Sequence, residues 1–238
     1  MRLFETLYSN HIEKKDKIRI SITGGGGKTT LLENLGSYLR KKDLSVLVTT
    51  TVKLANPLFH DYLTDYVYTK EKDVLSHKAK KGESVFYAET TQMDIKKAVS
   101  PRPEVLSVLL ERYDVIIAEA DGSRGLPIKW HTERDPVILD KNDLLIAVMG
   151  LDAVFEKSCT VAFGEESEII VDKRYLAKYF SDPEGLLKKK ETSSDSVIIF
   201  NKAEKASDLA IAEVIAAQPP CRSYFASIKR DEVIREVL

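Results

Sequence analysis

The sequence predicts an α/β fold in three layers, built on a mostly parallel β-sheet. Short apolar runs alternate with helical patterns along most of the 238 residues, which is typical of repeated strand and helix units. The apolar runs are continuous and rich in Val and Ile, as expected for strands that are buried on both faces of a parallel sheet. Ligands of such sheets bind at the carboxyl ends of the strands, so we expect functional residues directly after each strand.

The predicted elements follow one another in a regular order. The first strand, residues 17–22, leads through a glycine run into a helix at 29–43 whose leucines recur on one face. Further strands are predicted at 44–50, 65–69, 84–89, 114–121, 143–150 and 195–202. Further helices are predicted at 71–81, 102–113 and 171–180. We therefore expect a single domain over residues 1–238.

Residues 151–194 fit this alternation least well. They contain one good helix and then a connector rich in turn-forming residues, so this part of the chain is the one most suited to a small lobe or lid. The run Lys188–Lys190 within it reads as a solvated turn.

Composition excludes several classes of protein. There are 36 Lys and Arg against 37 Asp and Glu, for a net charge of −1, whereas a protein that neutralises nucleic-acid phosphates usually carries a basic excess. No apolar run approaches membrane-spanning length, and the first residues lack the apolar core of a signal peptide. The two cysteines, Cys159 and Cys221, form neither a disulfide framework nor a zinc pattern, and reduced thiols favour a cytoplasmic location.

A glycine run joins the first strand to the first helix. Such a loop can bring its backbone N–H groups and the start of the helix close to a phosphate chain. Lys28 would then reach the β- and γ-phosphates, and the Thr29 hydroxyl would hold Mg²⁺. The sequence therefore predicts a nucleotide site for ATP or GTP. Its predicted phosphate-loop residues are Gly24, Gly25, Gly26, Gly27, Lys28, Thr29 and Thr30.

This loop departs from the strict P-loop pattern, because Ile22 stands six residues before Lys28 where that pattern has Gly. The stretch TGGGGKTT is similar to the deviant loop KGGxGKTT of SIMIBI-class P-loop NTPases, with Thr23 in place of the signature lysine. The resemblance implies a P-loop NTPase-like fold of the SIMIBI type. Relatives in that class often dimerise across the nucleotide face, so a homodimer is one expectation here.

Two other strand ends carry polar residues. After the second strand, Thr50 and Thr51 offer hydroxyls to phosphate or to Mg²⁺-bound water. The strand at 114–121 ends in Glu119 and Asp121, which share one face because they are two residues apart. Two buried carboxylates need a cation, and a Mg²⁺ ion shared with Thr29 would supply it. Either acid would then ligate the metal or orient an attacking water, so both are also candidate catalytic residues with Lys28.

The residues after Asp121 suggest a mobile loop and a second contact surface. Arg124 lies between Gly122 and Gly125 and is a candidate for contact with phosphate or a second ligand. Lys129 opens a short polar segment that could face a substrate or partner. His131 in this segment reads as an ordinary loop histidine.

The strand at 195–202 ends in NKAE, which is similar to the guanine-reading NKxD motif. Asn201 and Lys202 match that motif, and Glu204 replaces its Asp. These three residues are therefore candidates for contact with the base.

Six motifs follow one another along the chain: the glycine loop, TTT, EADGSRGLPIK, VMGLDAV, DPEGLLK and NKAE. This order resembles the YqeC family of selenium-dependent hydroxylase accessory proteins. The resemblance implies an NTPase that helps mature selenium-dependent molybdenum hydroxylases, with such a client enzyme or its cofactor as partner. The residues themselves leave two alternatives open. One is a small-molecule kinase, and the other is a non-catalytic adaptor whose partner binding depends on nucleotide.

Overall fold

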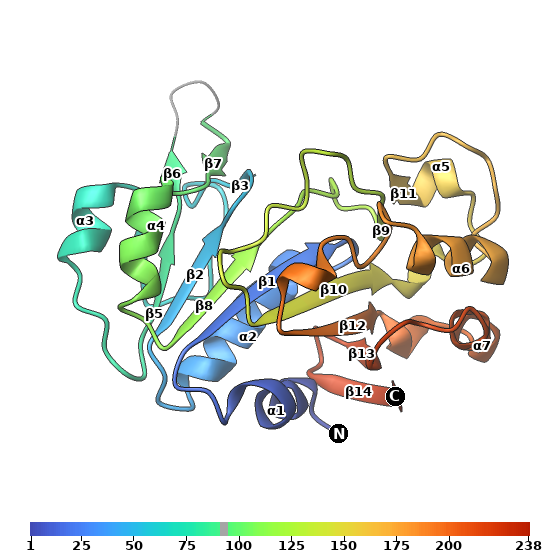
Figure 1. Ribbon diagram of the computed structural model, residues 1–238, viewed down its shortest axis with the longest axis horizontal. Helices are drawn as coiled ribbons and strands as arrows, with labels where there is room; N and C mark the ends of the chain where they lie inside the picture. The colour runs from blue at the N-terminus through green and yellow to red at the C-terminus, as the bar shows by residue number, and fades with distance from the viewer. Residues whose placement is uncertain (91–94) are drawn as a thin grey trace.

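A computed structural model describes residues 1–90 and 95–238. They contain a nine-stranded sheet in the order β14-β13-β12-β10-β1-β8-β2-β5-β4, in which every pair of neighbours is parallel except β13 and β14 (Figure 1). The strands of this sheet are β1 (Ile18–Gly24), β2 (Val46–Thr50), β4 (Tyr66–Tyr68), β5 (Ser84–Tyr87), β8 (Val115–Glu119), β10 (Leu144–Gly150), β12 (Asp195–Asn201), β13 (Ser223–Ser227) and β14 (Glu232–Val237).

Short strands form two smaller sheets beside the main one. The first contains β3 (Leu54–Ala55), β7 (Lys97–Val99) and β6 (Glu89–Thr90), and the second contains β11 (Ala162–Phe163) and β9 (Ile128–Lys129). The α-helices are α1 (Leu3–Leu7), α2 (Lys28–Arg40), α3 (Glu71–Ser76), α4 (Pro103–Leu110), α5 (Ser158–Val161), α6 (Lys173–Ser181) and α7 (Asp208–Ala216). Short helical turns are η1 (Tyr8–Ile12), which is a π-helix, and the 3₁₀ turns η2 (Leu151–Ala153), η3 (Lys190–Thr192) and η4 (Ala203–Lys205).

Helices cover both faces of the main sheet, and each layer has an apolar core. On one face, α1, η1 and α2 pack against alternate residues of the central strands, such as Ile20 and Ile146. On the other face, α3 and α4 cover β2, β5 and β8, while α6 and α7 cover β10, β12 and β13. Figure 1 shows these two helix pairs at opposite ends of the sheet. The arrangement confirms the predicted three-layer α/β class.

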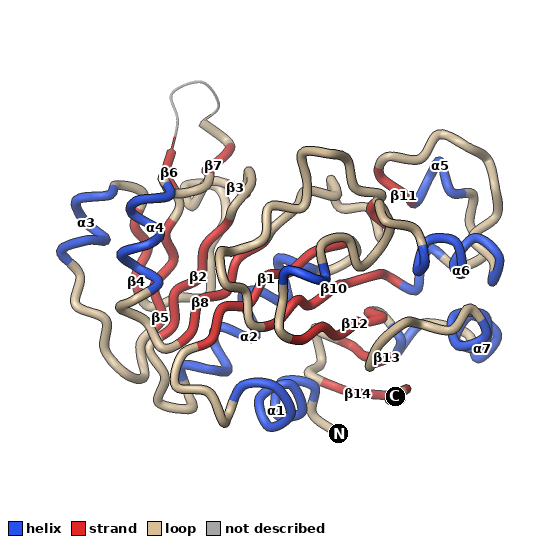
Figure 2. Tube along the Cα trace, viewed as in Figure 1, coloured by secondary structure: helices blue, strands red, loops and turns tan. Residues whose placement is uncertain are grey.

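A loop, not a helix, covers the centre of that second face. The strand β1 presents polar side chains there, and Ser21 donates a hydrogen bond from Oγ to Asn142 Oδ1 at 2.8 Å and accepts one from the Leu139 backbone N–H at 3.1 Å. Figure 2 shows the segment between β8 and β10 largely as loop across this region. The segment matters for function because it leaves the carboxyl end of β8 and returns over β1.

Most predicted elements are confirmed, with differences at their ends. The helix predicted at 71–81 stops at Ser76, because His77 adopts an extended backbone conformation. The helix α7 and the strands β13 and β14 lie beyond the last predicted strand and were not predicted. Within 151–194, the helix α6 packs onto β10 and β12 in the same apolar core as α7. No helix among the described residues has the length and apolar character needed to span a membrane.

The run Lys188–Lys190 is not simply a solvated turn, contrary to the sequence interpretation. Lys188 donates from Nζ to the Thr132 carbonyl at 2.5 Å, and Lys189 donates to the Pro136 carbonyl at 2.8 Å. These two contacts tie the connector to the loop that covers β1.

Candidate functional site

The glycine run lies between β1 and α2 because the space there admits no side chain. A Cβ on Gly24 would lie 2.1 Å from the Val148 carbonyl oxygen, and one on Gly27 would lie 2.4 Å from Asn201 Nδ2. Gly24 and Gly27 also have φ values of 93° and 145°, which L-residues rarely adopt. The glycines are therefore required by close packing as well as by backbone conformation.

The neighbouring segments use the N–H groups of the first glycines. Gly25 N–H donates to the Val148 carbonyl at 2.7 Å, and Gly26 N–H donates to the Leu126 carbonyl at 3.0 Å. The N–H groups of Gly27, Lys28 and Thr29 instead open the helix α2, where a helix has no internal acceptor for them. An anion would therefore meet the end of the loop and the first turn of α2, rather than the whole glycine run.

Lys28 is the centre of a buried polar cluster. Its side chain is 4% exposed, and its Nζ donates to the Gly24 carbonyl at 2.7 Å and to Ser123 Oγ at 3.2 Å. The same nitrogen lies 3.1 Å from Asp121 Oδ1 and 3.7 Å from Glu119 Oε1. The P-loop lysine thus neutralises the two carboxylates that end β8.

The two carboxylates have opposite electrostatic environments. Burial raises the pKa of Glu119, although Lys28 and a 2.8 Å hydrogen bond from the Thr29 hydroxyl oppose that shift. Burial would raise the pKa of Asp121 too, but Lys28, His131 and the Gly24 N–H at 2.7 Å hold that pKa below its ordinary value. Asp121 is therefore the firmly ionised member of the pair.

His131 completes the cluster, although the sequence suggested only an ordinary loop histidine. It is buried, and its Nε2 lies 2.7 Å from Asp121 Oδ2 while its Nδ1 lies 2.8 Å from the Gly185 carbonyl. Its backbone N–H donates to the Glu184 carbonyl at 2.9 Å. His131 thus links Asp121 to the turn that follows α6. Its ten-residue separation from Asp121 gives no periodic signal, so the sequence could not reveal this contact.

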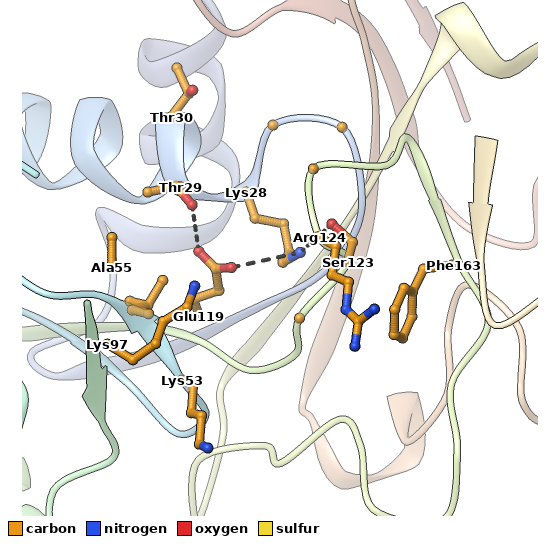
Figure 3. A pocket seen from close by; sticks show the side chains of 15 residues that line it. Lys28, Thr29, Thr30, Lys53, Ala55, Lys97, Glu119, Ser123, Arg124 and Phe163 are labelled. Atoms are coloured by element: carbon orange, nitrogen blue, oxygen red, sulfur yellow. Dashed lines mark hydrogen bonds and ion pairs between the residues drawn. The ribbon is translucent and has the colours of Figure 1, made fainter. Parts of the chain in front are cut away.

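A cavity of roughly 530 Å³ opens in front of Lys28 (Figure 3). Its phosphate-loop side contains Gly26, Gly27, Lys28, Thr29 and Thr30, with Glu119 beside them. The same cavity is also lined by Lys53, Lys97, Arg124 and Phe163, which come from four separate segments. The structure therefore brings the predicted residues Gly26–Thr30, Glu119 and Arg124 to one cavity.

Three predicted candidates are placed elsewhere. Thr50 is fully buried and donates to the Glu119 carbonyl at 3.0 Å, and Thr51 donates to the Val137 carbonyl at 2.5 Å. Lys129 is 1% exposed and pairs with Asp135 at 2.7 Å. These side chains fasten the β8–β10 loop and do not line the cavity.

The NKAE residues also lie outside the cavity lining. Asn201 donates from Nδ2 to the Gly26 carbonyl at 2.7 Å and accepts from the Ile228 N–H at 3.0 Å, so it fixes the loop. Lys202 pairs with Asp152 at 2.5 Å. Glu204 has a buried Oε2 that meets no hydrogen-bond partner among the described residues. Of the three, only Asn201 contacts the phosphate loop.

The oxygen atoms of this cluster suit a Mg²⁺ ion. The Glu119 carboxylate and the Thr29 hydroxyl are adjacent, and Asp121 Oδ1 is buried with the Lys28 ammonium 3.1 Å away as its charged partner. Oxygen ligands in small number, completed by phosphate and water, are the usual protein environment of Mg²⁺. Thr29, Glu119 and Asp121 are thus the residues able to hold the metal.

Comparisons with known proteins point to one family. The family model described as "YqeC protein" matches residues 20–163. A curated relative from Escherichia coli K12, "Uncharacterized protein YqeC", is 35% identical over 133 residues, which make up 55% of this chain and 51% of that protein. The match thus spans about half the length of the curated relative. The crystal structure of FtsY from Mycoplasma mycoides aligns over 97% of this chain and 71% of its own, with 13% identity and a TM-score of 0.38, which is too low to support an argument.

Proposed function

The chain belongs to the YqeC family, and we propose that it binds ATP or GTP together with Mg²⁺ and hydrolyses the nucleotide. One observation carries the proposal. Lys28, at the start of a helix after a glycine loop, points into the cavity region and is balanced by the carboxylates of Glu119 and Asp121. A buried lysine, two acids and a helix-terminal hydroxyl are the parts that phosphoryl-transfer sites use.

The proposed mechanism begins with an exchange of partners. Without ligand, Lys28 neutralises Asp121 at 3.1 Å and Glu119 at 3.7 Å. When a triphosphate binds, Lys28 turns to its β- and γ-oxygens, and the two carboxylates need a new cation. Thr29 and the two acids, Glu119 and Asp121, are the candidate ligands of a Mg²⁺ ion, which would supply that charge and offset the charge of the phosphates.

The remaining roles follow from burial and hydrogen bonding. Gly27, Lys28 and Thr29 present their N–H groups to the phosphates. His131 holds Asp121 in place from behind, so that carboxylate keeps one orientation. Of Glu119 and Asp121, the acid that does not ligate the metal is free to orient an attacking water.

The cellular role rests on the family resemblance. We propose that nucleotide turnover serves the maturation of selenium-dependent molybdenum hydroxylases, with the client enzyme or its cofactor as partner. A cytoplasmic location and a homodimer belong to the same proposal. A small-molecule kinase is the second candidate, because Arg124 lines the same cavity as Lys28 and could hold an acceptor.

Phosphate release by the purified protein tests the proposal. We expect release from ATP or GTP only with Mg²⁺, and we expect Thr29→Ala to lower turnover by about 10- to 1,000-fold, because one metal ligand is lost. Thr192→Ala, which removes an exposed hydroxyl on η3, is the matched control and should keep wild-type turnover. Equal turnover in Thr29→Ala and wild type would contradict the assigned metal site. A phosphorylated acceptor in place of free phosphate would favour the kinase.

A further inference from the structure

The cavity has a second side that the nucleotide proposal leaves unused. Lys53, Lys97, Arg124 and Phe163 line the same cavity as the phosphate loop, and we call them the cationic wall (Figure 3). A phosphate chain held by the loop and the first turn of α2 would share the cavity with this wall.

The cations of this wall have no acidic ion-pair partner among residues 1–90 and 95–238. Among the described residues, none of Lys53, Lys97 and Arg124 has a carboxylate within 4.0 Å in an ion pair. Lys129 is the contrasting case, since it lies close by, contacts the same Phe163 ring and is paired with Asp135 at 2.7 Å. Three like charges at one cavity repel one another unless an anion joins them.

The fold brings these residues together from distant parts of the chain. The strands β3 and β7 pair with Ala55 opposite Lys97, and Lys53 directly precedes β3, so this pairing brings the two lysines to the same cavity. Arg124 has a positive φ of 51° in an open loop, and its guanidinium carbon lies 5.1 Å from the centre of the Phe163 ring. That cation–π contact holds the guanidinium at the cavity.

We propose that the cationic wall binds a second ligand, a small molecule with a phosphate or carboxylate group, beside the bound nucleotide. Arg124 can bind such a group through two N–H donors, while the lysines act as point charges. The inference rests on the proposed nucleotide site and adds the class of a second substrate or effector to it.

The test measures binding of a small anion while a nucleotide analogue already occupies the phosphate loop. Wild-type protein is first saturated with Mg²⁺ and a non-hydrolysable ATP or GTP analogue, whose affinity is recorded. Binding of radiolabelled inorganic phosphate is then followed by equilibrium dialysis. We expect one phosphate per chain, displaced either by a phosphate monoester or by a dicarboxylate, and the more effective competitor identifies the group that the site prefers.

Variants separate the wall from the phosphate loop. Lys53→Ala, Lys97→Ala and Arg124→Ala should each weaken phosphate binding by about tenfold or more and change the analogue's affinity by less than about threefold. Lys72→Ala, an exposed lysine on α3, is the control and should change neither.

Two results would overturn the inference. The first is that the analogue-loaded wild type binds no phosphate. The second is that the wall variants weaken binding of the analogue as much as binding of inorganic phosphate. The cations would then hold the nucleotide's own phosphates. Failure of the analogue itself to bind wild type is a separate result, because it removes the proposed nucleotide site and this inference with it.

Discussion

Replacing Asp121 by Asn should destabilise the ligand-free protein strongly, whereas the same change at Glu119 should not. Asp121 is fully buried, lies 3.1 Å from Lys28 Nζ, and its Oδ2 lies 2.7 Å from both the Gly24 N–H nitrogen and His131 Nε2. An Asn that keeps its oxygen toward Gly24 and His131 turns its NH₂ group toward the Lys28 ammonium. Of its two carboxylate partners, Lys28 then keeps only Glu119, at 3.7 Å.

The size of this effect follows from the loss of one partner in a buried ion pair. Such a loss costs about 3–5 kcal/mol of the free energy of unfolding. A domain of this size is stable by only about 5–15 kcal/mol, and each kcal/mol shifts its Tm by roughly 2–4 °C. Asp121→Asn should therefore lower the urea midpoint and the Tm clearly, as followed by circular dichroism at pH 7.

Glu119→Gln is the matched control for this experiment. Burial raises the pKa of Glu119, so its ionised form costs stability at neutral pH, and Gln retains an acceptor for the Thr29 hydroxyl. We expect the free energy of unfolding of Glu119→Gln to equal or exceed that of wild type without ligand. A loss of stability in Asp121→Asn together with no loss in Glu119→Gln would show that the two carboxylates have opposite electrostatic environments.

The pH dependence gives an independent check. The pKa of Asp121 is depressed below its ordinary 3.8, so its contribution to stability is complete above pH 3.8 and is lost as the pH falls through the lower folded-state pKa. The difference in free energy of unfolding between wild type and Asp121→Asn should stay constant from pH 8 to pH 5 and shrink only below about pH 4. Equal stability of the two proteins at pH 7, or a gap already gone at pH 6, would refute this reasoning.

Four other substitutions, one of them a control, test parts of the site. Gly24→Ala should unfold or severely destabilise the protein, because its Cβ would lie 2.1 Å from the Val148 carbonyl oxygen. Gly122→Ala is the control: its Cβ would have no atom within 4 Å, so the free energy of unfolding should change by less than about 0.5 kcal/mol. Similar urea midpoints for the two variants would contradict this reasoning. His131→Ala should cost about 1–3 kcal/mol, because it removes the buried contacts of the ring with Asp121 Oδ2 and the Gly185 carbonyl, and it should lower Mg²⁺-dependent turnover. Asn201→Ala should lower the stability of the ligand-free protein by about 1–3 kcal/mol, because Asn201 bonds to Gly26 and Ile228, whereas a residue that only reads the base would change GTP affinity alone.

The sequence was most informative where a local pattern decides the structure. Continuous Val and Ile runs identified the central strands, and the glycines with Lys28 and Thr29 identified the strand–loop–helix unit. The i and i+2 spacing of Glu119 and Asp121 predicted that both carboxylates point the same way, and both lie within 3.7 Å of Lys28 Nζ. These inferences succeed because neighbouring residues on a strand or helix have fixed relative directions.

Contacts set by the path of a long loop could not be predicted in this way. His131 reaches Asp121 only because the segment after β8 turns back over β1, and its tie to Gly185 joins residues 54 positions apart. Lys53 and Lys97 reach the cavity through the pairing of two-residue and three-residue strands, which leave no periodic signal. Thr50 and Thr51 had the right position in sequence, but their hydroxyls are taken by nearby carbonyls.

Calorimetric titration with Mg²⁺ and ATP or GTP tests the central claim most directly. Wild type should bind one of these nucleotides. Lys28→Ala, confirmed as folded by circular dichroism, should bind it at least about 100-fold more weakly, a change of about 2.8 kcal/mol in binding free energy. Lys41→Ala, which removes an exposed lysine at the end of the same helix, should bind like wild type. No binding by wild type, or equal binding by wild type and Lys28→Ala, would contradict the assignment of the glycine loop as a nucleotide site.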